Sequence, residues 1–366
     1  MEIVLTSVGL KGDGRMKDKG HRQRVELALR HEEPDHVPVH NFANITPMKS
    51  AGLSMGEIRF DAKRSAEVAL RYAKMTHSDF VFPQLDINMI YKDLGVEVKL
   101  PDDNYSSVIS DLIKEPEDLD KMHFYNPFDA KTCPNFMHAI VDKVEMTANT
   151  ADEDFHIAGI SWGPFTMAGH LRGTEKLMMD TFAEPEFVVK LVKKTAKFAG
   201  QLEKRCMQAG ATHIWMPDPT ASEDMVSADV YKQFVFEPAK AMIHDLKREY
   251  KVPFIMHICG DTTNTMKLLP EIGVDCFSVD HKVDIAMAKQ AVGKKMAIMG
   301  NVHPIEAALN GTPEIVTRSS LACIQKAGMG GGFILSTGCE TPRDCPDENL
   351  VAMGKAALEH GKYPLK

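Results

Sequence analysis

The sequence predicts an α/β protein built as a single (β/α)8 barrel, the fold in which eight parallel strands alternate with helices. Three observations predict this fold. Eight short apolar runs recur along the 366 residues, helical patterns separate most of them, and no internal repeat or low-complexity linker divides the chain. A doubly wound open sheet shows the same alternation and is the main alternative.

The expected strands are short runs rich in Val, Ile, Phe and Met, bounded by polar or turn-forming residues. In chain order they are Val37–Phe42, Phe80–Gln84, His156–Ser161, His213–Pro217, Phe254–Cys259, Cys276–Asp280, Met296–Asn301 and Phe333–Thr337.

The expected helices have apolar residues three or four positions apart, which places those residues on one face. Thr312 and Pro313 show the pattern of an N-cap and a first helical turn. The helices include Arg22–Arg30, Glu186–Ala209, Val230–Tyr250, Met266–Ile272, Ile285–Val292, Pro313–Ala327 and Asn349–Glu359.

We expect residues 1–21 to form an N-terminal arm and residues 22–366 to form the barrel. The segment Gly95–Ser110 follows the second strand and is typical of an inserted hairpin. The glycine cluster Gly328–Gly332 precedes a strand, whereas a phosphate-binding loop follows one and opens a helix. It therefore predicts a structural turn at the opposite face from the active site.

The composition excludes several classes of partner. The chain has 43 Lys+Arg and 51 Asp+Glu, a net charge of −8, which disfavours nucleic acid as the main partner. No stretch approaches the roughly 20 apolar residues of a membrane span, and the N-terminal residues lack the order of a secretory signal. Seven cysteines, an odd number, fit a reducing compartment. We expect a cytoplasmic protein, and an oligomer remains open.

Reactive polar residues stand where the expected strands end, which is where a (β/α)8 barrel builds its active site. His257 and Cys259 are two positions apart on one strand, so both side chains point to the same side. Cys339 follows the last strand, and Asp218 follows the fourth as a candidate catalytic residue.

One His and two Cys form a three-ligand zinc site whose fourth position stays open, as in catalytic zinc centres. Cys345 lies six residues beyond Cys339 and is the alternative third ligand. A buried histidine packed beside a buried cysteine, without a metal, is the other interpretation of His257 and Cys259.

Several segments together resemble the uroporphyrinogen decarboxylase superfamily, from about Arg24 to the C-terminus. They include RVELALRHEEPDHVPV, ISWGPFT, MPDPTASEDMVSADVYKQF, MHICGDTTNT, GNVHPIEAALNGTPEIV and STGCETP. The resemblance implies a (β/α)8 barrel with its site at the carboxyl ends of the strands.

Two branches of that superfamily differ in their site residues. The segment HNFANITPMKSAGLS lacks the arginines that decarboxylases use to bind propionates, and Cys339 replaces their late histidine. Asp79 matches the central decarboxylase aspartate, so that branch stays open. The pattern of His257, Cys259 and Cys339 is similar to that of corrinoid-linked methyltransferases, where the matching residues hold zinc.

The resemblance implies methyl transfer between a corrinoid cobalt and a zinc-activated substrate, with a thiol such as coenzyme M as the expected acceptor. The chain lacks the Asp-X-His-X-X-Gly pattern of corrinoid-binding proteins, so a separate partner protein would carry the corrinoid. Trp162, Met167 and Met216 lie near strand ends and are candidates for an apolar rim that meets it. Demethylation of a methoxy donor, porphyrinogen decarboxylation and a non-enzymatic binding subunit are the alternatives.

Overall fold

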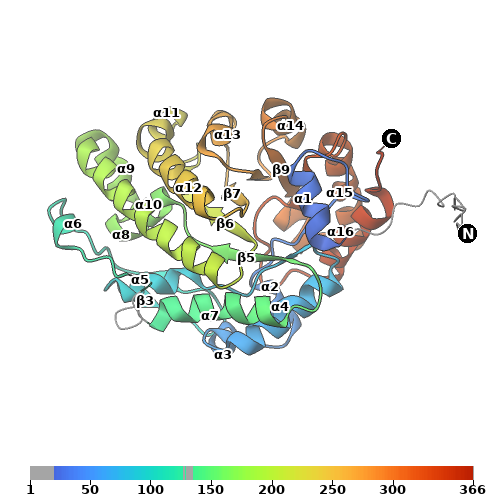
Figure 1. Ribbon diagram of the computed structural model, residues 1–366, viewed down its shortest axis with the longest axis horizontal. Helices are drawn as coiled ribbons and strands as arrows, with labels where there is room; N and C mark the ends of the chain where they lie inside the picture. Colours follow the sequence, from blue (N-terminus) through green and yellow to red (C-terminus); the bar gives the residue numbers. More distant parts are fainter. Residues whose placement is uncertain (1–19, 127, 129–134, 366) are drawn as a thin grey trace, which may run out of the picture.

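The structure is a computed structural model that describes residues 20–126, 128 and 135–365 (Figure 1). The expected N-terminal arm lies outside the described residues except for Gly20 and His21. Cys133 also lies outside them.

Eight strands form one sheet in which every neighbouring pair is parallel. The order is β1-β10-β9-β8-β7-β6-β5-β2, so the two edge strands are the first two strands of the chain. The strands are β1 Val39–His40, β2 Phe80–Val81, β5 His156–Ile160, β6 His213–Pro217, β7 Phe254–Ile258, β8 Cys276–Val279, β9 Ala297–Val302 and β10 Phe333–Thr337.

The backbone of Asp79 brings the two edges of this sheet together. Its N–H donates to the Val39 carbonyl at 2.8 Å, and its own carbonyl accepts from the His156 N–H at 3.0 Å. The sheet therefore curls into a nearly closed barrel, which confirms the predicted (β/α)8 fold over the open sheet.

Helices surround the strands, and α10 and α12 lie side by side outside β5 and β6 (Figure 1). The helices are α1 His21–Leu29, α2 Thr46–Ser50, α3 Met55–Ile58, α4 Ala62–Met75, α5 Ile90–Asp93, α6 Asp118–Lys121, α7 Asn135–Thr150, α8 Pro164–Arg172, α9 Thr174–Ala183, α10 Pro185–Gln208, α11 Ala228–Tyr231, α12 Glu237–Glu249, α13 Leu269–Ile272, α14 Ile285–Val292, α15 Pro313–Ala327 and α16 Asp347–His360. None of the described helices is long and apolar enough to cross a membrane.

The helix expected over Val230–Tyr250 is divided in the structure. A wide π-helical turn, Lys232–Phe236, separates α11 from α12, and Pro238 stands in the first turn of α12. Proline has no N–H to donate, so a break in the regular hydrogen bonding is tolerated at this point. The apolar periodicity continues through the turn, which explains why the sequence predicts one helix.

The inserted hairpin is present and consists of β3 (Val98–Lys99) paired antiparallel with β4 (Ser107–Val108). Its turn carries Tyr105, whose hydroxyl reaches the residues at the carboxyl ends of the barrel strands. The insertion therefore covers one side of the barrel mouth.

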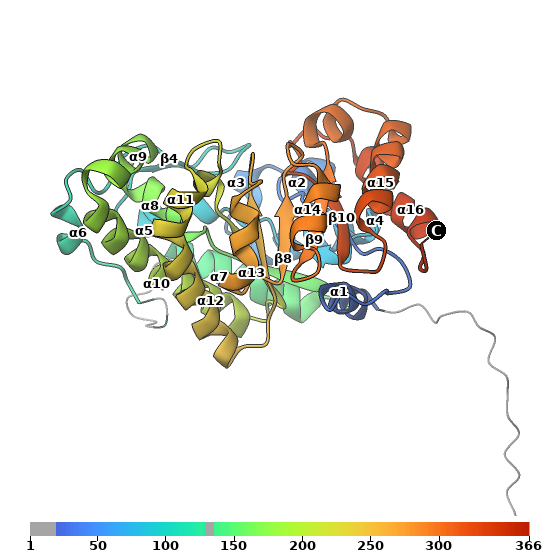
Figure 2. The same ribbon diagram turned by 90° about the horizontal axis from the view of Figure 1, so that it is seen from above.

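The opposite end of the barrel is closed by structural contacts. Helix α1 packs there, and the Arg22 N–H donates to the Asp154 carbonyl just before β5 (Figure 2). The glycine cluster lies between α15 and β10, and a side chain at Gly331 would meet the Glu32 carbonyl at 2.5 Å. This close approach is what a structural turn requires.

Candidate metal centre and adjoining cavity

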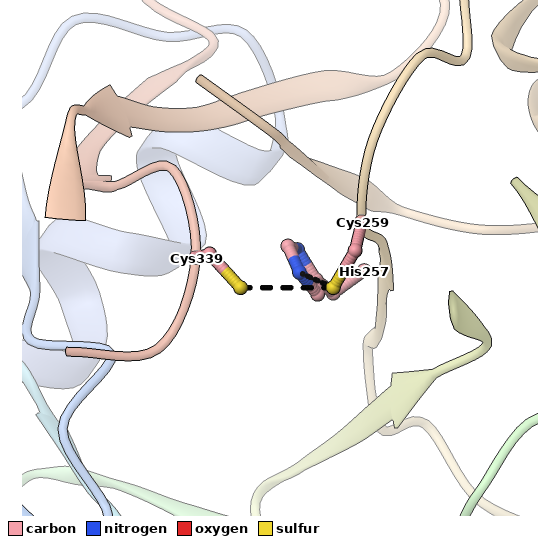
Figure 3. Close-up of side chains that lie close together, drawn as sticks. All are labelled: His257, Cys259 and Cys339. Atoms are coloured by element: carbon pink, nitrogen blue, oxygen red, sulfur yellow. Dashed lines mark hydrogen bonds between the residues drawn. The ribbon is translucent and has the colours of Figure 1, made fainter. Parts of the chain in front are cut away.

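His257, Cys259 and Cys339 converge at the carboxyl ends of two strands that are not neighbours in the sheet. His257 lies on β7, Cys259 directly follows it, and Cys339 follows β10 (Figure 3). The Sγ atoms of the two cysteines are 3.6 Å apart, and His257 Nε2 is 3.1 Å from Cys259 Sγ. All three donor atoms lie within 4.8 Å of one another.

This donor set fits zinc. Two sulfurs bound to one tetrahedral zinc at about 2.3 Å each are separated by roughly 3.8 Å, close to the spacing found here. Soft thiolates with an imidazole are ligands that zinc accepts readily. Among the described residues, no other group of three or more His, Cys, Asp or Glu residues meets the same spacing.

The orientation of His257 is set by its other ring nitrogen. Nδ1 lies 3.2 Å from the Ser278 carbonyl and 3.1 Å from the Ser278 hydroxyl on β8. A carbonyl can only accept, so Nδ1 carries the proton and Nε2 presents its lone pair to the cysteines. Such a hydrogen bond is the usual outer support of a zinc-binding histidine.

The two thiols have different proton affinities. A hydrogen bond from the Cys259 thiol and the neighbouring His257 hold the pKa of Cys339 below its usual range, at about 4. Cys339 is therefore a thiolate at neutral pH and is ready to act as a ligand.

Cys345 does not join the cluster. Its Sγ donates to the Ala308 carbonyl at 3.0 Å, and its side chain is buried. The structure thus brings together Cys339, rather than Cys345, with His257 and Cys259.

A cavity of about 210 Å³ adjoins the three donors. Most of its wall is aromatic or aliphatic, and its polar groups are few. The lining residues are Phe42, Asn44, Phe82, Leu85, Asp86, Ile87, Asn88, Tyr105, Ile160, Trp162, Trp215, Pro217, Pro219, His257, Cys259, Cys339 and Glu340. A concave apolar site with a few convergent polar groups is the usual form of a small-molecule site.

Glu340 is the polar lining residue next to Cys339. Its carboxylate accepts a short hydrogen bond from the Tyr105 hydroxyl, and the backbone N–H groups of Asn44 and Ile45 also contact it. Burial and the adjacent Cys339 raise the pKa of Glu340 to about 7. The sequence assigns no role to this pair, because Tyr105 reaches the site only through the folding of the hairpin.

The three residues proposed for an apolar rim occupy different environments. Trp162 lines the cavity and donates from Nε1 to Asn88 Oδ1 at 2.8 Å. Met167 and Met216 are fully buried and do not line it. On β6, Trp215 and Pro217 face the cavity, so Met216 between them points outward to the helices. The expected rim position of both methionines is therefore corrected to the core.

Trp215 is the lining residue that the sequence analysis missed. Its ring stacks on His40 at 4.8 Å and on His257 at 6.0 Å between ring centroids. The alternation along β6 contained the signal, because the residue two positions before Pro217 shares its face.

Asp218 lies beside the cavity but does not line it. Its Oδ1 accepts from the Thr166 N–H at 2.7 Å, in the first turn of α8. Burial raises the pKa of this carboxyl to about 6. The contact shows an aspartate that holds α8 against β6, as an acceptor at a helix N-terminus does.

Asp79 lies at the amino end of β2, away from the cavity. Arg24 and His21 contact its Oδ1, and the Val39 N–H donates to its Oδ2 at 2.8 Å. The expectation that Asp79 shares the catalytic end is therefore corrected: it precedes its strand, and its carboxylate is occupied by α1.

The fold and the site define a family. The model of the uroporphyrinogen decarboxylase (URO-D) family matches residues 21–360, and the chain belongs to that family. Its zinc-type donor set distinguishes it from a barrel recognised by shape alone.

Within the curated relatives, methyltransferases are prominent. The chain is 29% identical to methylcobamide:CoM methyltransferase MtbA of Methanosarcina acetivorans, over 93% of this chain and 98% of the relative. It is also 29% identical to the methylated-thiol–coenzyme M methyltransferase of Methanosarcina mazei, over 89% and 85% of the two chains. A uroporphyrinogen decarboxylase of Trichodesmium erythraeum is 27% identical over 69% of this chain and 70% of that one.

A solved structure has the same fold. The methyltransferase from Methanosarcina mazei superimposes with a TM-score of 0.83 at 20% identity, covering 93% of this chain and 98% of that one.

Proposed function

We propose that this protein is a zinc-dependent methyltransferase that works with a separate corrinoid protein. It would move a methyl group between the corrinoid cobalt and a substrate thiol bound beside His257, Cys259 and Cys339. The observation that carries the proposal is the set of three donors bordering an apolar cavity. The names of its relatives MtbA and methylated-thiol–coenzyme M methyltransferase support the same chemistry.

The residues of the chain have distinct parts in this chemistry. His257, Cys259 and Cys339 would hold the zinc, and Ser278 keeps His257 in the required tautomer. Bound zinc supplies a Lewis acid that favours the thiolate form of a substrate thiol at neutral pH. The apolar walls, including Phe42 and Trp215, exclude water from the sulfur that must attack the methyl group.

The corrinoid would be carried by a partner protein that docks at the barrel mouth. Trp162 is the member of the proposed apolar rim that lines the cavity and is only partly buried. It stands where a flat macrocycle would approach the substrate.

Demethylation of a methylated donor, the reverse half-reaction, is the second candidate. The aromatic and aliphatic walls of the cavity favour it, because they also suit a methoxy compound. Decarboxylation of a porphyrinogen has less support, since a cavity of about 210 Å³ is far smaller than a tetrapyrrole and Asp79 lies at the other end of the barrel.

A methyl-transfer assay tests the proposal. Zinc-loaded protein is mixed with methylcobalamin and a panel of thiols, and separately with cob(I)alamin and methoxyaromatics. Methylation of a thiol supports the proposed direction, and methylation of cob(I)alamin supports the reverse. Porphyrinogen decarboxylation without either transfer would contradict the proposal.

A further inference from the structure

The cavity beside the zinc ligands offers no cationic side chain to a substrate. Neither Lys nor Arg occurs among the described residues that line it. Two carboxyl groups, those of Asp86 and Glu340, do line it. The charge of the walls therefore disfavours an anionic substrate before any contact is considered.

The cations nearest to the lining carboxyl groups are already engaged. Arg59 is 4% exposed, donates from Nε to Asp86 Oδ2 at 3.0 Å, and uses Nη2 for the carbonyls of Pro101 and Asn104. Lys143 is fully buried and donates to the Gln84 carbonyl at 2.8 Å. Neither lines the cavity, so neither is placed to pair with a substrate anion.

The neutral donors of the cavity wall are engaged as well. Asn44 Nδ2 donates to the Leu85 carbonyl and the Tyr105 hydroxyl, and that hydroxyl donates to Glu340. Asn88 Nδ2 donates to the Ser106 carbonyl, and Trp162 Nε1 donates to Asn88. An anion in the cavity would have to break one of these contacts to gain a hydrogen bond.

The size of the cavity limits the substrate further. About 210 Å³ equals the volume of roughly seven water molecules at about 30 Å³ each. Only a small molecule fits there.

We propose that the substrate at this centre is a small uncharged thiol, and that a thiol bearing a sulfonate, such as coenzyme M, is disfavoured. The proposal rests on the proposed function and narrows its substrate. A buried anion with neither counter-charge nor hydrogen-bond donors loses its hydration without compensation. An uncharged thiol places only its sulfur beside the metal ligands and packs its apolar part against Phe42, Phe82 and Ile160.

The transfer balances without a further reactant. The thiol loses its proton to solvent, and a sulfur electron pair forms the S–CH3 bond. The Co–CH3 bond breaks, and its electron pair stays on the cobalt, which passes from Co(III) to Co(I).

Two thiols that differ only at one end test the proposal. Coenzyme M and 2-mercaptoethanol share a two-carbon thiol and carry a sulfonate or a hydroxyl. With methylcobalamin as donor we expect 2-mercaptoethanol to have a kcat/KM at least about tenfold higher, as the loss of one charged hydrogen-bonded pairing implies. Propanethiol, which has a methyl group at that end, should share this advantage.

Binding is measured separately from turnover. Calorimetric titration of zinc-loaded protein with the same thiols gives affinities that do not depend on methyl transfer. We expect the same order of affinities, with coenzyme M weakest. Equal or tighter binding of coenzyme M would overturn the inference, whereas thiol binding without methylation of any thiol would count against the proposed function alone.

A charge-addition variant provides a second test. Ile87 lines the cavity and is 5% exposed, so Ile87→Lys places an ammonium group in the wall. We expect it to raise the coenzyme M to 2-mercaptoethanol ratio of kcat/KM and of affinity. Ile87→Met, of similar length but uncharged, is the matched control and should leave both ratios unchanged. A preference for coenzyme M in the wild-type protein overturns the inference even where Ile87→Lys does not fold.

Discussion

At the scale of single residues, the site depends on how firmly one imidazole is held. The Ser278 hydroxyl and carbonyl both contact Nδ1 of His257, leaving Nε2 for a metal. A second histidine in the barrel has a comparable serine contact, because His40 Nδ1 lies 3.1 Å from Ser336 Oγ. Only the first of these histidines lies beside the two cysteines, so the pair of serines separates metal support from packing.

Replacing Ser278 by Ala should weaken zinc binding. The hydroxyl contact is lost while the carbonyl contact remains, so we expect about a tenfold loss of affinity, at the low end for outer support of a ligand. Competition with a fluorescent chelator measures it. Ser336→Ala is the control and should leave the zinc affinity unchanged. An equal loss in both variants would show that the effect is one of folding.

The identity of the third ligand gives a second prediction at this scale. Cys339→Ala removes one of three donors, so the purified protein should lose most of its zinc, whereas Cys345→Ala should retain about one zinc per chain. Metal analysis by mass spectrometry checks both. Full zinc in Cys339→Ala would exclude Cys339 from the site.

At the scale of elements, the inserted hairpin is held to the barrel by a buried ion pair. Asp86 accepts from Arg59 Nε at 3.0 Å and from the Ser106 hydroxyl at 2.6 Å. Arg59 in turn donates to the carbonyls of Pro101 and Asn104 within the insertion. These contacts set the position from which Tyr105 reaches Glu340.

Asp86→Asn should destabilise the protein and loosen the hairpin. Arg59 would keep its charge in a buried place without a counter-charge, a change that typically costs about 3–5 kcal/mol. Denaturant unfolding measures the free energy of unfolding, and hydrogen exchange locates the loosened segment. Asp103→Asn in the exposed part of the hairpin is the control and should have little effect. Unchanged exchange in Asp86→Asn would refute this role.

The elements also show what sequence alone could predict. Strand parity places His257 and Cys259 on one face, and the end of β10 places Cys339 beside them. The same parity would have placed Trp215 inside and Met216 outside.

Other features depend on contacts that no local pattern encodes. Asp79 stands one residue before a strand, so a match of sequence motifs could not show which end of the barrel it occupies. Tyr105 meets Glu340 across a sequence separation of 235 residues.

At the scale of the whole molecule, the barrel interior holds neutral histidines. His40, His156 and His213 are at most 2% exposed. Burial lowers the pKa of His156 to about 4 and that of His40 to about 3. The folded barrel therefore keeps these rings unprotonated in mildly acidic solution.

Stability should fall as the pH drops from about 6.5 to about 4. The unfolded state takes up a proton on His156 near pH 6.5, whereas the folded state does so only near pH 4. The loss from this residue approaches about 3 kcal/mol at pH 4. Unfolding of the zinc-free protein measures it, and His156→Gln should flatten the pH dependence. The exposed His360→Gln is the control; an unchanged slope in His156→Gln would contradict the assignment.

The central claim is that the barrel carries a zinc ion whose open position receives the substrate. X-ray absorption at the zinc edge, with and without 2-mercaptoethanol, tests it most directly. We predict two sulfurs at about 2.3 Å and one nitrogen at about 2.0 Å in the resting protein, and a third sulfur at about 2.3 Å with the thiol bound. Protein without zinc, or a coordination shell that does not change with an active thiol, would contradict the claim.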